Sequence, residues 1–521
     1  MKLALGQYDD PLNQRQPILY LDPYQSNIAI FGAPMSGKTT FIKTLLVRLH
    51  ENMGNQAPVE NIYLIDFGGN IGSFGKLGNI CACFDSSNEE NIKRVFKTIE
   101  RRLADNAKQL DSQSYYSVAT KTPQKAPTHI FLIIENINAF LADERYATYQ
   151  DTLIRFCRDG LSKGLTVVIT ANETAGLNRL LSNFRQKIAF EMPNESYHDI
   201  FDTKVNKPMR IPGRGIVNID AAIYEFQCFL PFSTKSDKED EQCLERLIEE
   251  TNKHPNENAI AAFSDDLTWE NYDRYCSKDS CRLSDTQIVV GLDYYEHKPV
   301  AVNIDESRAI AIYGKRRYGK TNLLHLLLEG IHAKVPDPDA NFIYFDDGRK
   351  QLLDFYNADS KKAEYFTDVT RVQEYLAEEG YISIRRGQNS QPSPIKETPY
   401  TVFVMQSKML YRNSPAAKSL LGIHFPLMIS DAIARKFLFI FSDVPNISEQ
   451  DIRRIFNDNI SVAFLLDNIG DFLSDRNDKT AFGSMDAREL KAEYARCSVG
   501  DGYAYDVDTA ELQKLKFIKV E

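Results

Sequence analysis

Apolar residues along the chain alternate between short runs of strand length and longer stretches in which they recur at helical spacing. A strand that is buried on both faces reads as a continuous run of Val, Ile, Leu and aromatic residues, as in the centre of a parallel sheet. We predict strands near 28–32, 61–66, 129–134 and 166–171, and then near 309–313, 341–346, 401–405, 437–441 and 460–466. The alternation of such strands with helices predicts an α/β fold with mostly parallel sheets covered by helices.

The two halves of the chain repeat one pattern. Residues 28–49 read IAIFGAPMSGKTTFIKTLLVRL, and residues 310–328 read IAIYGKRRYGKTNLLHLLL. Each copy then reaches a strand that ends in an acidic residue, Asp66 in the first and Asp346 in the second. Self-similarity of this kind indicates a tandem duplication of one α/β domain.

Both copies contain the phosphate-loop pattern G-x-x-x-x-G-K-[ST] between a predicted strand and a predicted helix. The glycines let successive backbone N–H groups point at phosphate oxygens, the lysine reaches the β- and γ-phosphates, and the hydroxyls of Thr39 and Thr321 can ligate Mg²⁺. These features predict binding of ATP with Mg²⁺. The candidate nucleotide-binding residues are Gly32, Ala33, Pro34, Met35, Ser36, Gly37, Lys38, Thr39 and Thr40, and in the second copy Gly314, Lys315, Arg316, Arg317, Tyr318, Gly319, Lys320, Thr321 and Asn322.

The second loop and the hydrolytic residues leave alternatives open. Four bulky residues fill the second loop, which either binds nucleotide more weakly than the first or has lost binding. Hydrolysis ordinarily needs a metal-supporting acid and a water-orienting group at the end of a later strand. Those positions read Glu135-Asn136 in the first copy and Gln406-Ser407 in the second, so Glu135 is the one weak catalytic candidate. Asp66 and Asp346 either help to organise magnesium or cap turns.

A change in composition marks the boundary between the copies. Residues 235–250 carry seven acidic residues against three basic ones, which is typical of a solvated linker or exposed helix. Leu244, Leu247 and Ile248 favour a short helix with one apolar face, and 255–285, with the single tryptophan Trp269, is interpreted as a connector that packs on the second domain. We therefore predict a first P-loop domain at 1–232, a charged linker and connector at 233–285, and a second P-loop domain at 286–521.

Charge and cysteine content narrow the function further. The 62 basic and 72 acidic side chains give a net charge of −10, which argues against a surface that neutralises many nucleic-acid phosphates. No apolar run approaches the ~20 residues of a membrane-spanning helix. The eight cysteines lack zinc-finger spacing and are interpreted as reduced thiols of a cytosolic protein.

Nearly the whole chain resembles the paired C-terminal ATPase domains of the FtsK/SpoIIIE-type motors of type VII secretion, the EssC/EccC family. The resemblance rests on the two phosphate loops and on 63–69 (YLIDFGG), 158–172 (RDGLSKGLTVVITAN) and 211–215 (IPGRG) in the first copy, and on 290–293 (VGLD) and 500–503 (GDGY) in the second. It implies two RecA/FtsK-like P-loop NTPase domains, the second and third of the family's three. It also implies that the chain is part of a longer membrane protein, at the cytoplasmic side of the bacterial cell membrane.

The resemblance implies partners as well. The last ATPase domain would recognise small secreted helical-hairpin proteins through a C-terminal signal, docked in an apolar groove near the P-loop helix. Other domains and subunits of the secretion machine would be further partners, and the family's first ATPase domain is the one expected to hydrolyse ATP productively. The apolar stripe Leu323, Leu324, Leu327, Leu328 and Ile331 is more typical of core than of such a groove. In related motors an arginine commonly follows a Glu-Gly pair, but the position after Asp159-Gly160 is Leu161 here. The alternative function is a DNA translocase of the FtsK/SpoIIIE kind, and a third is a scaffold that binds no nucleotide.

Overall fold

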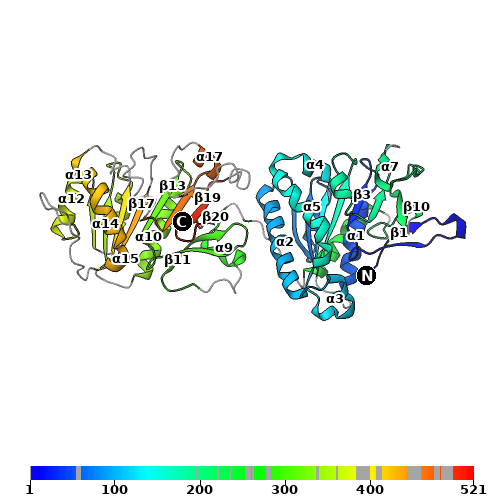
Figure 1. The fold of residues 1–521 in the computed structure, drawn as a ribbon, viewed down its shortest axis with the longest axis horizontal. Coiled ribbons are helices and arrows are strands. Elements are labelled where there is room, and N and C mark those ends of the chain that lie inside the picture. The colour runs from blue at the N-terminus through cyan, green and yellow to red at the C-terminus, as the bar shows by residue number, and fades with distance from the viewer. Residues whose placement is uncertain are drawn as a thin grey trace. The chain divides into compact units, whose positions relative to one another are not determined.

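The protein is described from a computed structural model, in which the chain divides into two compact units, residues 1–262 and 263–521 (Figure 1). The structure describes residues 2–53, 60–193, 196–219, 222–234, 236–252, 260, 263, 266–276, 283–335, 340–358, 362–382, 399–406, 414–442, 459–474, 482 and 497–520. Ser407 and parts of the predicted 233–285 linker therefore lie outside the described residues.

In the first unit, ten described strands form one sheet. The strands are β1 (Leu3–Tyr8), β2 (Ile18–Leu21), β3 (Ile28–Phe31), β4 (Glu60–Asp66), β5 (Ile80–Asp85), β6 (His129–Glu135), β7 (Leu165–Ala171), β8 (Gln186–Ala189), β9 (Arg214–Ile219) and β10 (Ala222–Cys228). Their order is β2-β1-β10-β9-β8-β3-β7-β6-β4-β5. The pairings from β8 to β5 are parallel, and those from β8 to β2 are antiparallel.

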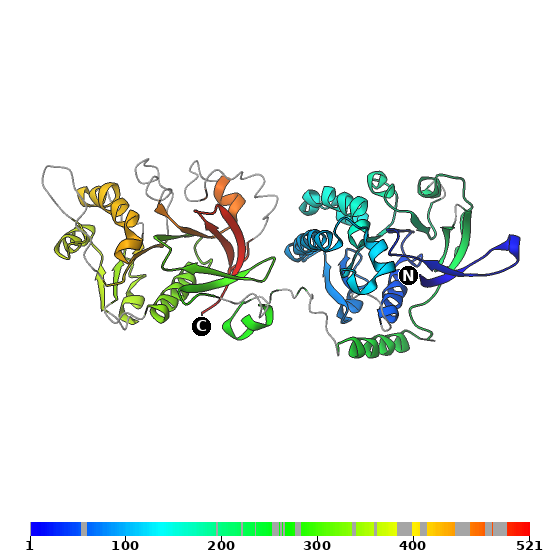
Figure 2. The same cartoon turned by 60° about the horizontal axis from the view of Figure 1, so that its bottom comes forward.

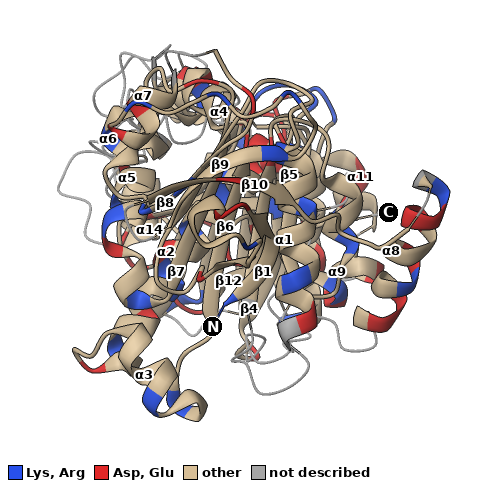
Figure 3. Ribbon diagram, turned by 90° about the vertical axis from the view of Figure 1, so that its right-hand side faces the viewer, with Lys and Arg blue, Asp and Glu red and all other residues tan. Residues whose placement is uncertain are grey.

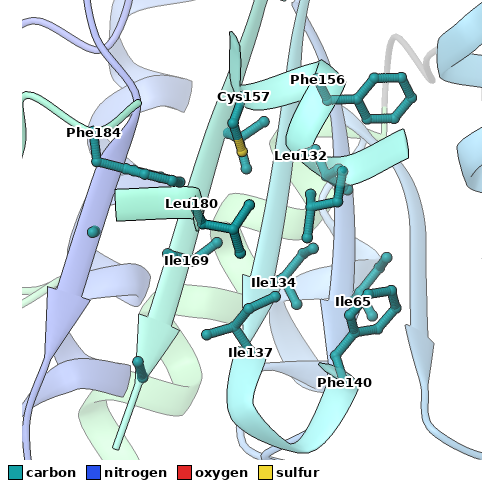
Figure 4. Packing of buried hydrophobic residues seen from close by; sticks show 14 of the residues in the cluster. Ile65, Leu132, Ile134, Ile137, Phe140, Phe156, Cys157, Ile169, Leu180 and Phe184 are labelled. Atoms are coloured by element: carbon teal, nitrogen blue, oxygen red, sulfur yellow. The ribbon is translucent and has the colours of Figure 1, made fainter. Parts of the chain in front are cut away.

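Helices cover both faces of this sheet. They are α1 (Lys38–Met53), α2 (Glu89–Leu110), α3 (Tyr115–Lys121), α4 (Ile137–Ala142), α5 (Gln150–Asp159), α6 (Asn178–Leu181), α7 (Ser196–Phe201) and α8 (Asp237–Thr251). The core on one face joins the strands to α2, α4, α5, α6 and α7, and Figure 4 shows strand residues such as Ile134 and Ile169 packed against Phe140, Phe156 and Leu180. The opposite core contains α1 and α3. Because β6 is buried along its whole length, its sequence is apolar without alternation.

The acidic segment between the copies contains the expected helix. Leu244, Leu247 and Ile248 of α8 pack partly buried against the core that contains α1, and Figure 2 shows α8 as the green helix beside the first unit. The hydroxyl of Thr251 accepts a hydrogen bond of 2.9 Å from the backbone N–H of Gly78. In Figure 3, acidic residues gather on α8, while charged residues elsewhere lie mainly on helices and loops. Helix α8 therefore packs on the first unit with its acidic face outward.

The second unit repeats the topology of the first. Its strands are β11 (Gln287–Asp293), β12 (Pro299–Asn303), β13 (Ala309–Gly314), β14 (Asn341–Phe345), β15 (Lys362–Phe366), β16 (Thr401–Gln406), β17 (Phe437–Ser442), β18 (Val462–Leu466), β19 (Asp501–Asp506) and β20 (Glu511–Phe517). Their order, β12-β11-β20-β19-β18-β13-β17-β16-β14-β15, matches that of the first sheet strand for strand. The duplication inferred from the sequence is therefore present in the fold.

The helices of the second unit divide between the two sheet faces in the same way. They are α9 (Trp269–Tyr275), α10 (Lys320–Lys334), α11 (Leu353–Ala358), α12 (Val369–Glu378), α13 (Pro415–Ser419), α14 (Phe425–Ser430), α15 (Ala432–Arg435) and α17 (Ile469–Ser474). One core contains α9, α10 and α11, and the other contains α12 to α15 and α17. Helix α9, which lies in the predicted connector, buries Tyr272 and Tyr275 in the core that contains α10, whereas Trp269 is exposed.

The structure can be compared with the strands and the apolar stripe predicted from the sequence. All nine predicted strands are present, although the last begins at Val462 rather than at 460. The remaining strands, including the antiparallel extension of each sheet, were not predicted. Leu323, Leu324, Leu327, Leu328 and Ile331 are buried, so the apolar stripe of α10 is core. None of the helices that the structure describes is both long and apolar enough to cross a membrane.

Candidate nucleotide site

The first phosphate loop connects β3 to α1 with the backbone that its glycines permit. Met35 and Gly37 lie in the left-handed region, at φ +62° and +117°. A Cβ atom at Gly37 would lie 2.8 Å from the backbone nitrogen of Gly213, so the loop is closed against a second segment that leaves no room for a side chain. A loop of this shape turns successive N–H groups toward one point, which is a binding site for an anion.

The lysine of this loop folds over its concave side. Lys38 Nζ donates hydrogen bonds to the carbonyl oxygens of Gly32, at 2.6 Å, and Ala33, at 2.9 Å. Burial lowers the pKa of Lys38, and the nearby Glu135 carboxylate acts in the opposite direction. In a P-loop this ammonium contacts the β- and γ-phosphates of the nucleotide. The phosphate oxygens could replace the two carbonyl oxygens as acceptors of the Lys38 hydrogen bonds.

Thr39, the magnesium ligand predicted from the sequence, lies in contact with Glu135. The Thr39 hydroxyl, in the first turn of α1, donates a hydrogen bond of 2.7 Å to Glu135 Oε1 at the end of β6. Glu135 is 4% exposed, and burial together with the neighbouring Asp66 carboxylate raises its pKa to about 7, against the effects of Thr39 and Lys38. A hydroxyl and a carboxylate beside phosphate oxygens are the hard oxygen donors that Mg²⁺ prefers, so this donor set fits the ion.

The two acidic residues that end β4 and follow β14 cap turns. The Asp66 carboxylate accepts backbone hydrogen bonds from Gly68, Gly69, Asn70 and Ile71, at 3.1, 2.6, 3.3 and 3.0 Å. The Asp346 carboxylate accepts them from Gly348, Lys350 and Leu352, at 2.8, 3.0 and 2.8 Å. Of the two roles left open by the sequence, the geometry favours turn capping for both residues.

The backbone turns at Asn136, the residue after Glu135, where β6 ends and α4 begins. Asn136 adopts the left-handed conformation at φ +60°, and its N–H donates to the Thr170 hydroxyl at 2.8 Å. At the end of β7, the N–H of Asn172 donates to Asn138 Oδ1 at 2.9 Å. These contacts join the ends of β6 and β7. Asn136 and Asn172 both carry neutral amides, which cannot take a proton from an attacking water molecule.

Residues 211–215 form a second wall of the site. The N–H of Gly213 donates to the carbonyl of Ser36 at 2.9 Å, and the Gly213 carbonyl accepts from the N–H of Cys228 at 2.8 Å. Arg214 pairs with Glu225 at 3.0 Å and also with Asp9. The antiparallel part of the sheet thus holds this segment against the phosphate loop.

A cavity of about 220 Å³ lies between the first phosphate loop and the segment that contains Gly213. Its lining includes five residues predicted from the sequence: Met35, Gly37, Lys38, Thr39 and Thr40. Five others were missed as site residues: Pro212, Gly213, Gln227, Cys228 and Leu230. In the sequence, only family resemblance marks the 211–215 segment (IPGRG). The sequence of β10 does not indicate a site, because its position depends on antiparallel pairing with β9 and β1.

The other residues of the first loop occupy defined places around the cavity. Met35 is 95% exposed at the loop tip, while Ser36 is buried beneath it. Pro34 is exposed, and Gly32, Ala33 and Thr40 are buried or half-buried. The structure therefore brings the whole predicted segment to the mouth or the floor of one site.

The second phosphate loop keeps the backbone of the first. Arg317 and Gly319 are left-handed, at φ +70° and +102°, at the positions equivalent to Met35 and Gly37. Lys320 Nζ donates to the carbonyls of Gly314, at 2.7 Å, and Lys315, at 2.8 Å. The bulky residues do not distort this geometry, because Arg316 and Arg317 are exposed and Tyr318 packs against the core of the unit.

The chemistry around the second loop differs from that of the first. Lys315 Nζ forms an ion pair of 2.8 Å with Asp467, which raises the pKa of Lys315. Gln406 holds the register position of Glu135, and its Nε2 donates to Gln351 Oε1 at 2.6 Å. An amide in place of the carboxylate removes the negative charge that would support magnesium beside Thr321, so the second donor set suits the ion less well than the first.

The start of α10 is tied to the end of the last strand. Asn322 Nδ2 donates to the carbonyl of Ile518, and Asn322 Oδ1 accepts from the N–H of Val520, both at 2.8 Å. In the first unit the corresponding strand end is held one turn further along α1, where the Thr44 hydroxyl donates to the Phe229 carbonyl at 2.8 Å. The two units therefore differ at the side of the loop where the first has its cavity.

The duplicated sheet, with a phosphate loop after the first parallel strand of each copy, defines tandem P-loop ATPase domains. No protein-family model matches the chain. Its homologues are the EccC and EssC ATPases of type VII secretion. The chain is 25% identical over 344 residues to the ESX secretion system protein EccC of Geobacillus thermodenitrificans, covering 64% of this chain and 23% of that protein. It is 19% identical over 552 residues to the type VII secretion system protein EssC of Staphylococcus aureus, covering 100% of this chain and 34% of that protein.

Solved structures with the same fold cover the whole chain. EssC (ATPases 2 and 3) from Geobacillus thermodenitrificans has a TM-score of 0.73 at 19% identity, with 96% of that chain covered. Thermomonospora curvata EccC (ATPases 2 and 3), solved in complex with a signal sequence peptide, has a TM-score of 0.66 at 18% identity, with 93% covered. The chain thus has the fold of paired ATPases 2 and 3, and it spans about a quarter to a third of the length of the curated relatives named above.

Proposed function

We propose that this chain is the ATP-binding module, ATPases 2 and 3, of a type VII protein-secretion motor, with weak or no hydrolysis of its own. The observation that carries the nucleotide assignment is the first loop, in which Lys38 lies over the phosphate position and Thr39 contacts Glu135 at 2.7 Å. The homologues, which are secretion ATPases, support the placement in a secretion machine.

Within that machine, the module regulates the motor and recognises secreted substrates. Its partners are small secreted helical-hairpin proteins that carry a C-terminal signal, together with other domains and subunits of the machine. The Thermomonospora curvata relative solved with a signal sequence peptide supports this proposal. The module works at the cytoplasmic side of the bacterial cell membrane, to which other segments of the full protein attach it.

The two loops have unequal roles. The first holds Mg²⁺ and ATP through Lys38, Thr39 and Glu135. The second holds a nucleotide more weakly and with less dependence on magnesium, because Gln406 brings no charge and Asp467 places a carboxylate beside Lys315. Slow hydrolysis follows from Asn136, which cannot act as a base for the attacking water.

The test is to denature the purified chain and quantify the nucleotide that it releases, and then to titrate the nucleotide-free chain with ATP. Bound adenine nucleotide, or saturable ATP binding, is the expected result. No nucleotide and no binding would leave a scaffold as the better account. Salt-dependent binding to duplex DNA that stimulates hydrolysis would favour a DNA translocase instead.

A further inference from the structure

The cavity of the first unit continues past the phosphate loop toward the antiparallel strands. In a P-loop the N–H groups that follow the lysine cradle the α- and β-phosphates, so the nucleoside of a bound nucleotide points beyond them. Besides the loop residues, the cavity is lined by Gly213 and Cys228 and by the side chains of Pro212, Gln227 and Leu230. A bound nucleotide would therefore direct its base toward these three residues.

The size and lining of this space suit a flat, partly polar ring. About 220 Å³ lies below the roughly 300–1,000 Å³ of a site that encloses a whole drug-sized ligand, as expected where only part of a nucleotide is covered. Pro212 and Leu230 offer apolar surface, and Leu230 is 60% exposed although it lines the cavity. Gln227 adds a polar group that can contact the edge of a base.

The orientation of the Gln227 amide is fixed by its neighbour. Nε2 donates to the carbonyl oxygen of Pro212 at 3.2 Å, and a carbonyl can accept only from the NH₂ end of an amide. Among the residues that the structure describes, none donates a hydrogen bond to Gln227 Oε1. The cavity thus contains a hydrogen-bond acceptor whose place is set by the protein backbone.

We propose that this cavity is the nucleobase subsite of the first unit, and that Gln227 selects adenine over guanine. The amino group at position 6 of adenine is a donor, which Gln227 Oε1 accepts, whereas guanine carries an acceptor oxygen there and leaves two acceptors facing each other. The inference rests on the proposed nucleotide binding and adds the group that reads the base.

The second unit has different chemistry at the same register position. Lys516 lies opposite Asp501 as Gln227 lies opposite Arg214. Lys516 Nζ pairs with the Asp501 carboxylate at 2.9 Å, and an ammonium offers donors only. A nucleotide at the second loop would meet no acceptor from Lys516, so the base-reading contact proposed for Gln227 has no counterpart at this position.

The experiment compares ATP and GTP by calorimetric titration of the full chain with Lys320→Ala, which silences the second loop. We expect ATP to bind about tenfold or more tightly than GTP, the effect of one hydrogen bond gained or opposed. Gln227→Ala should bring the ratio close to one, mainly by weakening ATP. Gln227→Met preserves the side-chain volume and should do the same, while Gln242→Ala, at an exposed glutamine of α8, should keep the ratio.

The outcomes separate this inference from the proposed function. If the folded Lys320→Ala chain binds neither nucleotide, the assignment of the first loop is wrong. If it binds ATP and GTP equally, or if the preference for ATP survives both Gln227 variants, the nucleotide assignment stands and the role of Gln227 is overturned. Thermal melting of each variant shows whether a lost ratio reflects the amide or a lost fold.

Discussion

Thr39 and Glu135 are joined by a hydrogen bond of 2.7 Å, which links the first phosphate loop to the end of β6. The second unit has the same strands and the same loop backbone, yet Gln406 at the equivalent position donates to Gln351 instead. At this equivalent position of the duplicated fold, the first unit therefore has a carboxylate that could support magnesium and the second has a neutral amide. We therefore attribute the proposed difference in nucleotide and magnesium binding between the two sites to this contact more than to the bulky residues of the second loop.

Glu135 should make the stability of the first unit depend on pH. Its pKa is raised from 4.5 to about 7, so between these values the folded chain keeps a proton that the unfolded chain has lost. Stability therefore falls as pH rises through this window, and the cost is complete above pH 7. Glu135→Gln should remove the cost, and its gain over the parent should grow by about 1–2 kcal/mol between pH 5 and 8, allowing for solvent screening.

Chemical denaturation without nucleotide at pH 5, 6, 7 and 8 measures this gain. Glu173→Gln, at an exposed carboxylate of the same unit, is the control and should give no growing difference. A gain that stays constant across the four pH values would show that the Glu135 carboxyl is ionised in the folded chain throughout this range.

The two equivalent glycines Gly37 and Gly319 should respond differently to alanine. Both are left-handed, so each substitution adds backbone strain of about 1–2 kcal/mol. At Gly37 the new Cβ would also meet the Gly213 backbone at 2.8 Å, whereas at Gly319 its nearest neighbour is a Leu466 methyl at 3.5 Å. Gly37→Ala should thus cost about 2–4 kcal/mol and abolish the thermal shift caused by ATP.

Denaturation curves and ATP-dependent melting of the two variants provide the comparison. Gly319→Ala should lose less stability and retain most of the shift. Equal losses in the two variants would mean that the close approach of Gly213 to the loop is not a constraint in solution.

Steady-state turnover by the isolated chain should be slow. In the first unit, Glu135 is followed by Asn136 rather than by a second acid, and the neighbouring Asp66 carboxylate is engaged by backbone N–H groups. The second unit has Gln406 in place of Glu135. We expect phosphate release far below the ~1 s⁻¹ at the low end of ordinary enzymes. A magnesium-dependent rate at or above that value, lost on Lys38→Ala, would contradict the role given to Asn136.

The local sequence was sufficient to predict most strands of the parallel part of each sheet and the two phosphate loops. Strands such as β6 are buried on both faces and read as unbroken apolar runs, and the loop needs glycine, lysine and threonine at fixed spacing. The antiparallel extension was not predicted, because its strands are half-exposed or amphipathic; the burial of β2, for example, alternates along the strand. Their position in the sheet depends on pairing with strands far away in the chain.

The cavity residues that the sequence did not predict also owe their position to strand pairing between distant segments. Gln227 reaches the cavity because β10 pairs with β1 at one edge and β9 at the other, which brings residues more than 180 positions after the loop beside it. Asp467, the partner of Lys315, likewise follows a strand that pairs with β13 across about 150 residues. Such contacts are set by topology, and the motif at 211–215 was their one visible trace in the sequence.

The most direct test of the account is the ATP-induced rise in melting temperature of the parent chain, Lys38→Ala and Lys320→Ala at one nucleotide and magnesium concentration. Ligand that binds the folded state stabilises it by RT ln(1 + [L]/Kd), so the tighter site dominates the shift. The account predicts that Lys38→Ala removes most of the shift and that Lys320→Ala removes little. The reverse ranking would contradict it, because the dominant nucleotide site would then lie in the second unit.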